Sequence, residues 1–163
     1  FKTKVLTIKT QMGHKKLMRI MGLDVGSKTI GVAISDELGI TAQGFKTIKR
    51  KAMEDDLREL YTIISQFQVE KIVVGLPKNM DGSLGKQAEF VLGWIEDFKN
   101  KIQLPVETWD ERLSTVEASK TLLKADLSRK KRKGVIDKLA AVLILQGYLQ
   151  QIRSRKDEPL SPA

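Results

Sequence analysis

The chain has 163 residues, of which 41% are hydrophobic and 30% are charged, and this balance predicts a single soluble domain. Its lack of cysteine excludes disulfides and thiolate metal sites, and no apolar run approaches the roughly 20 residues that span a bilayer. The formal charge of +9 suggests an anionic partner, although five lysines and no acid in residues 1–17 leave only +4 for the remainder.

Residues 1–17 precede the first clear strand pattern and are interpreted as an N-terminal extension, a misassigned start or a disordered basic arm. Lysines interrupt this segment throughout, so it lacks the apolar run of a secretory signal. Together with the absence of cysteine, this predicts a cytoplasmic protein that does not associate with membranes.

The first half of the domain is predicted to be mainly β-structure. Apolar and β-branched patterns predict strands over residues 19–24, 30–35 and 41–48, which we expect to form an antiparallel meander. A helix over residues 52–67 and a short buried strand over residues 71–76 follow.

The second half alternates helices with one more strand. Residues 77–85 are predicted to form a loop, and a further helix opens at Ser114, where Glu117 completes a capping box. The remaining predicted elements are a helix over 86–99, a strand over 106–109, a basic loop over 128–134, an apolar helix over 135–152 and a disordered tail over 153–163. This order predicts one α/β domain over residues 18–152, with a mixed sheet and helices on its faces.

Acidic residues end two of the predicted strands. Asp24 ends the first strand before Gly26, and Asp110 and Glu111 end the last strand before Arg112. Ligand sites of open α/β sheets lie beyond the carboxyl ends of strands, although Asp24 would also suit a plain turn. Strand alternation points Asp110 and Glu111 to opposite sides, and we favour Asp110 as the site residue because it occupies the strand end.

Asp137 lies near the start of the long apolar helix. A carboxylate on a largely buried helix is costly unless it is paired or bound to a cation, although the helix dipole alone would favour an acid there. Carboxylates from three distant segments suit Mg²⁺ or Mn²⁺, which activate water in phosphodiester hydrolysis. With His14 as the single histidine and no cysteine, a zinc site or a Ser-His-Asp triad is not expected.

Four segments in this order resemble the YqgF/RuvX family of Holliday junction resolvase-like proteins and pre-ribosomal RNA nucleases. They are GLDVGSKTIGVA at 22–33, VGLPKNMDG at 74–82, WDERLST at 109–115 and DKLAAVLIL at 137–145. The resemblance implies a ribonuclease H-like three-layer fold with a five-stranded sheet. It also implies that Asp24, the Asp110–Glu111 pair and Asp137 form a catalytic metal site, and that the protein matures the 5′ end of pre-16S ribosomal RNA. The resemblance does not show which of Asp110 and Glu111 is the metal ligand.

Basic and amide side chains near these acids are predicted to contact phosphates or sugars, although each would also suit a loop or an ion pair. They are Lys28, Asn79, Arg112, Arg129, Lys130, Lys131, Arg132 and Lys133. Trp94 and Trp109 lie in apolar elements and are expected in the core rather than as base-stacking platforms.

Three other functions remain open at this point. The same chemistry on a four-way DNA junction would be expected from a homodimer with two sites, and the sequence leaves a monomer and a homodimer both open. The Asp24–Thr29 turn is similar to the first phosphate loop of actin-like and sugar-kinase domains, but the chain leaves no room for their second lobe. A non-catalytic RNA-binding factor for ribosome assembly would keep the basic run without needing Asp137.

Overall fold

The computed structural model describes residues 18–113 and 129–157, in which five strands form one sheet. Its elements are β1 (Arg19–Val25), β2 (Thr29–Ser35), β3 (Ala42–Lys49), α2 (Met53–Phe67), β4 (Val69–Leu76), α3 (Lys86–Lys99), β5 (Val106–Asp110), the 3-10 helix η1 (Glu111–Leu113) and α5 (Arg129–Asp157).

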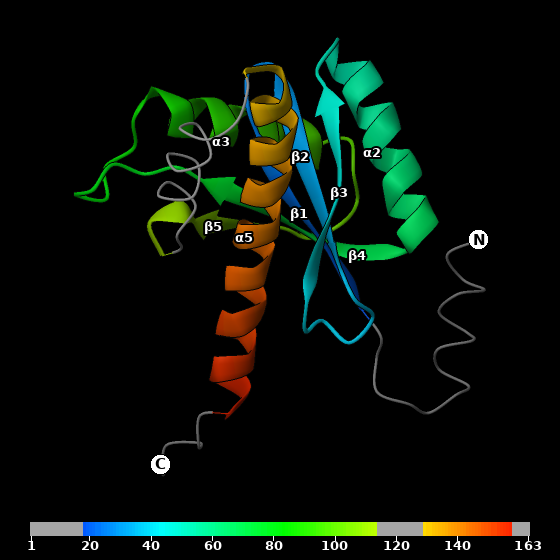
Figure 1. Cartoon of the computed structure of the whole chain (residues 1–163), viewed down its shortest axis with the longest axis vertical. Coiled ribbons are helices and arrows are strands. Elements are labelled where there is room, and N and C mark those ends of the chain that lie inside the picture. Colours follow the sequence, from blue (N-terminus) through cyan, green and yellow to red (C-terminus); the bar gives the residue numbers. More distant parts are fainter. Residues whose placement is uncertain (1–17, 114–128, 158–163) are drawn as a thin grey trace.

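The sheet is mixed, as the sequence predicts, with strand order β3-β2-β1-β4-β5. β2 runs antiparallel to both β1 and β3, which confirms the meander, whereas β1, β4 and β5 are parallel. The ends of β1, β3, β4 and β5 and the start of β2 therefore share one edge, which we call the carboxyl edge. This edge lies at the top of the central strands in Figure 1.

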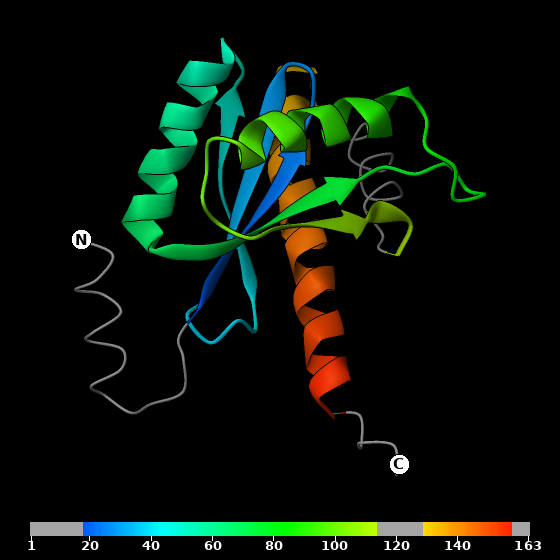
Figure 2. The same cartoon turned by 180° about the vertical axis from the view of Figure 1, so that it is seen from behind.

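Each face of the sheet packs against helices through its own hydrophobic core. α2 and α3 cover one face, where Leu23, Val74 and Phe98 are buried. α5 covers the other face, where Val73, Trp109 and Leu145 are buried. Figures 1 and 2 show α5 on one side of the sheet and α3 on the other, so the molecule has three layers.

Local sequence explains where α2 ends. Leu57, Leu60 and Ile63 form the buried stripe of this helix, in keeping with helical periodicity. Gln68 then adopts a left-handed conformation (φ 52°), and its backbone N–H bonds the carbonyls of Ile64 and Ser65, which ends the helix.

Two boundaries of the last helix were predicted wrongly. The predicted basic loop at 128–134 is helical from Arg129, and the predicted disordered tail is helical through Asp157. Lysine and arginine have high helix propensity, so a run of them extends a helix even where it has no apolar stripe. Residues 153–157 contain no proline or glycine that would end the helix.

Some predicted elements lie outside the described residues. These are the N-terminal extension at 1–17, the helix opened by Ser114 and Glu117, and residues 158–163 of the predicted tail. Within residues 18–113 and 129–157, no helix combines the length and the apolar character needed to cross a bilayer.

Candidate active site

Asp24 lies in the sheet with a glycine on each neighbouring strand. Gly31 of β2 is its partner in the antiparallel ladder. On the other side, Leu23 pairs with Val74, so Gly75 follows at the level of Asp24. Directly paired residues point to the same face, and here that face is the one covered by α5. Asp24 is half-buried on this face.

The space left by these two glycines is filled by the other predicted site segments. A Cβ atom on Gly31 would lie 2.0 Å from the carbonyl oxygen of Asp137. A Cβ atom on Gly75 would lie 2.7 Å from the Oε1 atom of Glu111 and 2.3 Å from the Cδ1 atom of Ile144. The glycines thus let α5 and the Glu111 carboxylate approach the sheet on either side of Asp24.

Asp137 is held by a residue from β2. The hydroxyl of Thr29 donates a hydrogen bond to the Oδ2 atom of Asp137, which is half-buried. Because α5 begins at Arg129, Asp137 lies about two turns inside the helix. The prediction that the dipole of a nearby helix start favours this acid is therefore wrong, since that effect fades within the first turn. Thr29 was not singled out from the sequence, although it lies in the first segment of the family resemblance.

Asp110 and Glu111 have different surroundings, in keeping with their predicted opposite directions. β5 ends at Asp110, and Glu111 begins η1 with its side chain 5% exposed. Asp110 is half-buried and accepts hydrogen bonds from the Arg112 guanidinium, the shortest at 2.8 Å from Nη2. These bonds hold the pKa of the Asp110 carboxyl below its ordinary value, although burial opposes the shift. Glu111, rather than the favoured Asp110, therefore lies against the sheet beside Asp24.

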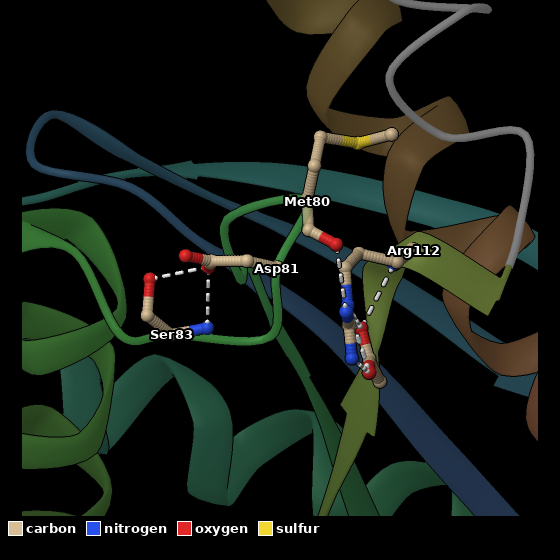
Figure 3. Close-up of polar contacts among 5 residues, drawn as sticks. Met80, Asp81, Ser83 and Arg112 are labelled. Atoms are coloured by element: carbon tan, nitrogen blue, oxygen red, sulfur yellow. Dashed lines mark hydrogen bonds and ion pairs between the residues drawn. The ribbon is translucent and has the colours of Figure 1, made fainter.

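Arg112 also fastens the loop that follows β4. Its Nη1 atom donates to the carbonyl of Met80 at 3.2 Å, and Figure 3 shows the Met80 side chain pointing away from this bond. Within the loop, Ser83 donates to Asp81 through its backbone N–H (2.9 Å) and its hydroxyl (2.6 Å). The Asn79 amide donates to the Ser83 hydroxyl at 3.0 Å. Arg112 and Asn79, both predicted to bind nucleic acid, are thus engaged within the protein.

A buried ion pair that sequence reasoning missed holds the turn after Asp24. The Arg50 Nε atom lies 3.2 Å from the Oδ2 atom of Asp56, a residue 1% exposed, and its Nη1 atom donates to the carbonyl of Gly26 at 3.0 Å. The Arg50 backbone N–H donates to the Lys28 carbonyl at 2.9 Å. The pair thus connects α2 to the turn that carries Thr29. No local sequence pattern distinguishes it from an ordinary surface pair.

The predicted metal ligands are Asp24, Asp137 and one of the Asp110–Glu111 pair, with Asp110 favoured. Their oxygen donors suit Mg²⁺ or Mn²⁺ in chemistry. In the described part of the chain, however, no three acidic or histidine side chains lie close enough together to hold a metal ion. The three segments meet at one place, whereas their carboxylates do not form a ready set of ligands.

The remaining predictions concern the basic residues and the tryptophans. Lys28 is exposed in the turn at the carboxyl edge. The backbone of Arg129–Lys133 forms the start of α5, and the side chains of this run lie outside the described part. Trp94 and Trp109 are each 5% exposed, which confirms their prediction as core residues.

Comparison with known proteins gives a family match over most of the chain. The model of the RuvX family, described as "Holliday junction resolvase", matches residues 18–151. A protein of Desulforamulus reducens is 64% identical over 132 residues, covering 81% of this chain and 96% of its own length. A protein of Clostridium acetobutylicum is 58% identical over 135 residues, covering 83% of this chain and 100% of its own length. Both carry the name "Putative pre-16S rRNA nuclease".

Solved structures with low sequence identity share the fold. RuvC of T. thermophilus in complex with a Holliday junction substrate has a TM-score of 0.53 at 15% identity, with 88% of this chain and 99% of that chain covered. A second Thermus thermophilus RuvC structure has a TM-score of 0.50 at 13% identity, covering 84% and 97%. The predicted ribonuclease H-like architecture is confirmed by these likenesses together with the five-stranded mixed sheet.

Proposed function

The chain belongs to the RuvX family, whose members are phosphodiester-cleaving hydrolases, and we propose that it is a divalent-metal-dependent endonuclease that matures the 5′ end of pre-16S ribosomal RNA. The relatives that carry the pre-16S nuclease name match this chain over almost their whole length, which supports a shared activity. We further propose that the enzyme works in the cytoplasm, where ribosomal RNA precursors are processed.

The observation that carries this proposal is the arrangement around Asp24. Two glycines flank this residue in the sheet, and Glu111 and Asp137 come from separate segments to pack over them. These three acids share the face covered by α5, and a divalent cation would offset the electrostatic cost of bringing three carboxylates together there. We therefore propose Asp24, Glu111 and Asp137 as the metal-binding carboxylates, with Asp110 as the neighbour that keeps Arg112 in place.

These residues would hold Mg²⁺ or Mn²⁺. When bound, such an ion activates a water molecule and stabilises the leaving oxygen of the phosphodiester. Thr29 orients the Asp137 carboxylate through its hydroxyl, and the Arg50–Asp56 pair holds the turn that carries Thr29. In the described residues these carboxylates do not form a ready set of three ligands, so we propose that their side chains rearrange when the ion binds.

A four-way DNA junction is the second candidate substrate. The description of the family and the fold shared with RuvC favour it, although likeness of fold alone does not select a substrate. A junction resolvase has to make two symmetric cuts, which would require a dimer of this chain.

The test is a cleavage assay with both substrates side by side. The full chain would be incubated with Mn²⁺ and either a pre-16S RNA fragment or a four-way DNA junction. We expect a cut near the 5′ end of the mature RNA, lost in Asp24→Asn while circular dichroism shows a folded protein. Asp97→Asn, an exposed acid near the end of α3, is the matched control and should cleave normally.

The outcomes separate the two candidates. Paired symmetric cuts in the junction, with the RNA left intact, would replace the RNA proposal by the junction proposal. Equal cleavage by Asp24→Asn and the unmodified protein would contradict the proposed site. RNA binding without any cleavage would favour the non-catalytic assembly factor.

A further inference from the structure

Cationic side chains at the carboxyl edge differ in whether the protein already uses them. On the β4–β5 side, Arg112 bonds Asp110 and the Met80 carbonyl, and the half-buried Lys78 lies close enough to Asp110 to help lower the pKa of that carboxyl. On the β2–β3 side, Lys28, Lys49 and Lys51 are exposed, and in residues 18–113 and 129–157 no carboxylate pairs with them. The two sides of the site are therefore unequal in positive charge available to an external ligand.

Lys49 lies on the same face as the proposed carboxylates. It is the direct partner of Thr29 in the β2–β3 ladder, so the two side chains project from the same side of the sheet. Thr29 in turn donates to Asp137 on that side. Ile48, the neighbour of Lys49, points to the opposite core, as strand alternation requires.

Lys28 and Lys51 lie next to Lys49 at the end of the same ladder. The Lys28 carbonyl accepts the backbone N–H of Arg50, at 2.9 Å, so the turn after β1 stays in register with the end of β3. The Lys51 backbone N–H donates to the Oδ1 atom of Asp56, also at 2.9 Å, which fixes the chain just beyond β3. The positions of these lysines are thus set by backbone contacts, while their side chains remain exposed.

We propose that Lys28, Lys49 and Lys51 bind consecutive backbone phosphates of the nucleic acid, so that the strand to be cut crosses the β2–β3 side of the carboxyl edge. This inference rests on the proposed function and adds the path of the substrate to it. Lysines bind phosphates as point charges and do not read base sequence, so this side positions the strand without selecting its sequence. Arg112, held by Asp110, does not contribute to this path.

Lys46 provides a matched control on the same strand. It pairs with Val32 in the ladder and therefore points to the opposite face, towards α2. Its ammonium lies 3.3 Å from the Oε2 atom of Glu59. Removing the charge of Lys46 alters the net charge of the protein by the same amount as removing that of Lys49, but not on the proposed path.

The experiment measures binding without cleavage. Fluorescence anisotropy of a labelled pre-16S RNA fragment, in EDTA and at several KCl concentrations, would give the affinity and its salt dependence for Lys28→Gln, Lys49→Gln, Lys51→Gln and Lys46→Gln. We expect each of the first three to weaken binding about three- to tenfold at roughly 0.1 M salt and to reduce the salt slope by about one ion. Lys46→Gln should match the unmodified protein in both the affinity and the salt slope.

Affinity and salt slope unchanged in Lys49→Gln, or equal losses in Lys46→Gln, would overturn the inference. A protein that binds neither this RNA nor a four-way junction would also overturn the inference. Because the assay contains no divalent metal, its result is independent of the cleavage test. Binding that depends on the lysines in a protein that does not cleave would leave the path intact and remove the proposed activity. Normal cleavage with unaltered binding in all three lysine variants would leave the proposed activity intact and remove the proposed path.

Discussion

The hydroxyl of Thr29 donates a hydrogen bond to the carboxylate of Asp137, although 108 residues separate the two in sequence. This contact joins the start of β2 to the helix on the other side of the proposed site. It links the segment that carries Asp24 directly to the segment that carries Asp137.

Replacing Thr29 tests whether this contact orients Asp137. Thr29→Val removes the donor and keeps a similar shape, and we expect kcat/KM for RNA cleavage to fall roughly tenfold or more, because partners of metal ligands commonly contribute that much. Thr29→Ser keeps a hydroxyl and should recover most of the activity. Cleavage by Thr29→Val at the rate of the unmodified protein would show that the contact has no role in orientation.

Asp110 and Glu111 are separated by their surroundings, and their variants should differ accordingly. Glu111→Gln removes a buried carboxylate beside Asp24, and we expect it to lower the cleavage rate at least about a hundredfold. Asp110→Asn weakens only the contact to Arg112, so its rate should fall less than about tenfold. Single-turnover rates with Mn²⁺ would measure both, and the opposite ranking would assign the ligand role to Asp110.

The Arg50–Asp56 pair should matter for stability as well as for the site. Asp56→Ala leaves the Arg50 guanidinium largely buried without its carboxylate, and we expect a loss of about 3 kcal/mol in the free energy of unfolding. The exposed Arg58–Asp55 pair in the same helix, at 3.8 Å, is the control, and Asp55→Ala should cost less than about 1 kcal/mol. Urea unfolding of both variants measures the difference, and similar losses would contradict the assigned role of Arg50.

Gly31 is predicted to be intolerant of any side chain. An alanine Cβ there would lie 2.0 Å from the Asp137 carbonyl oxygen, so Gly31→Ala must displace α5 or the sheet, at a cost of about 3 kcal/mol. Gly93→Ala is the matched control, because nothing lies within 4 Å of its Cβ position in α3, and it should stabilise the protein by about 0.5–1 kcal/mol. Thermal unfolding that moves in the same direction for both variants would show that the close approach at Gly31 is not required.

Sequence patterns predicted the layers of the fold because those depend on local periodicity. The apolar spacing of residues 86–99 predicts a helix with the bounds that α3 has, and strand alternation predicts the meander of β1 to β3. The start of α5 was misplaced because the basic residues 129–133 have helix propensity but no apolar spacing. That error made Asp137 look like an acid at a helix start.

The site itself was only partly accessible from the sequence. Asp24 stood out through its strand-end position and the family resemblance, and Asp137 through its place on an apolar helix. The structure brings their segments together at Gly31. Strand alternation predicted the opposite directions of Asp110 and Glu111, but the burial of Glu111 depends on η1, a short turn without a sequence signal of its own. Thr29 and Arg50 make contacts with residues on other elements, and such pairings leave no local pattern.

The binding of Mn²⁺ to the full chain tests the central claim most directly, because it does not depend on the choice of substrate. Free Mn²⁺ would be followed by electron paramagnetic resonance during titration of the unmodified protein and of Asp24→Asn, Asp137→Asn and Asp97→Asn. We predict saturable binding that weakens at least about tenfold in the first two variants and is unchanged in Asp97→Asn. An unmodified protein that binds no Mn²⁺, or equal binding by all four proteins, would contradict the proposed metal site.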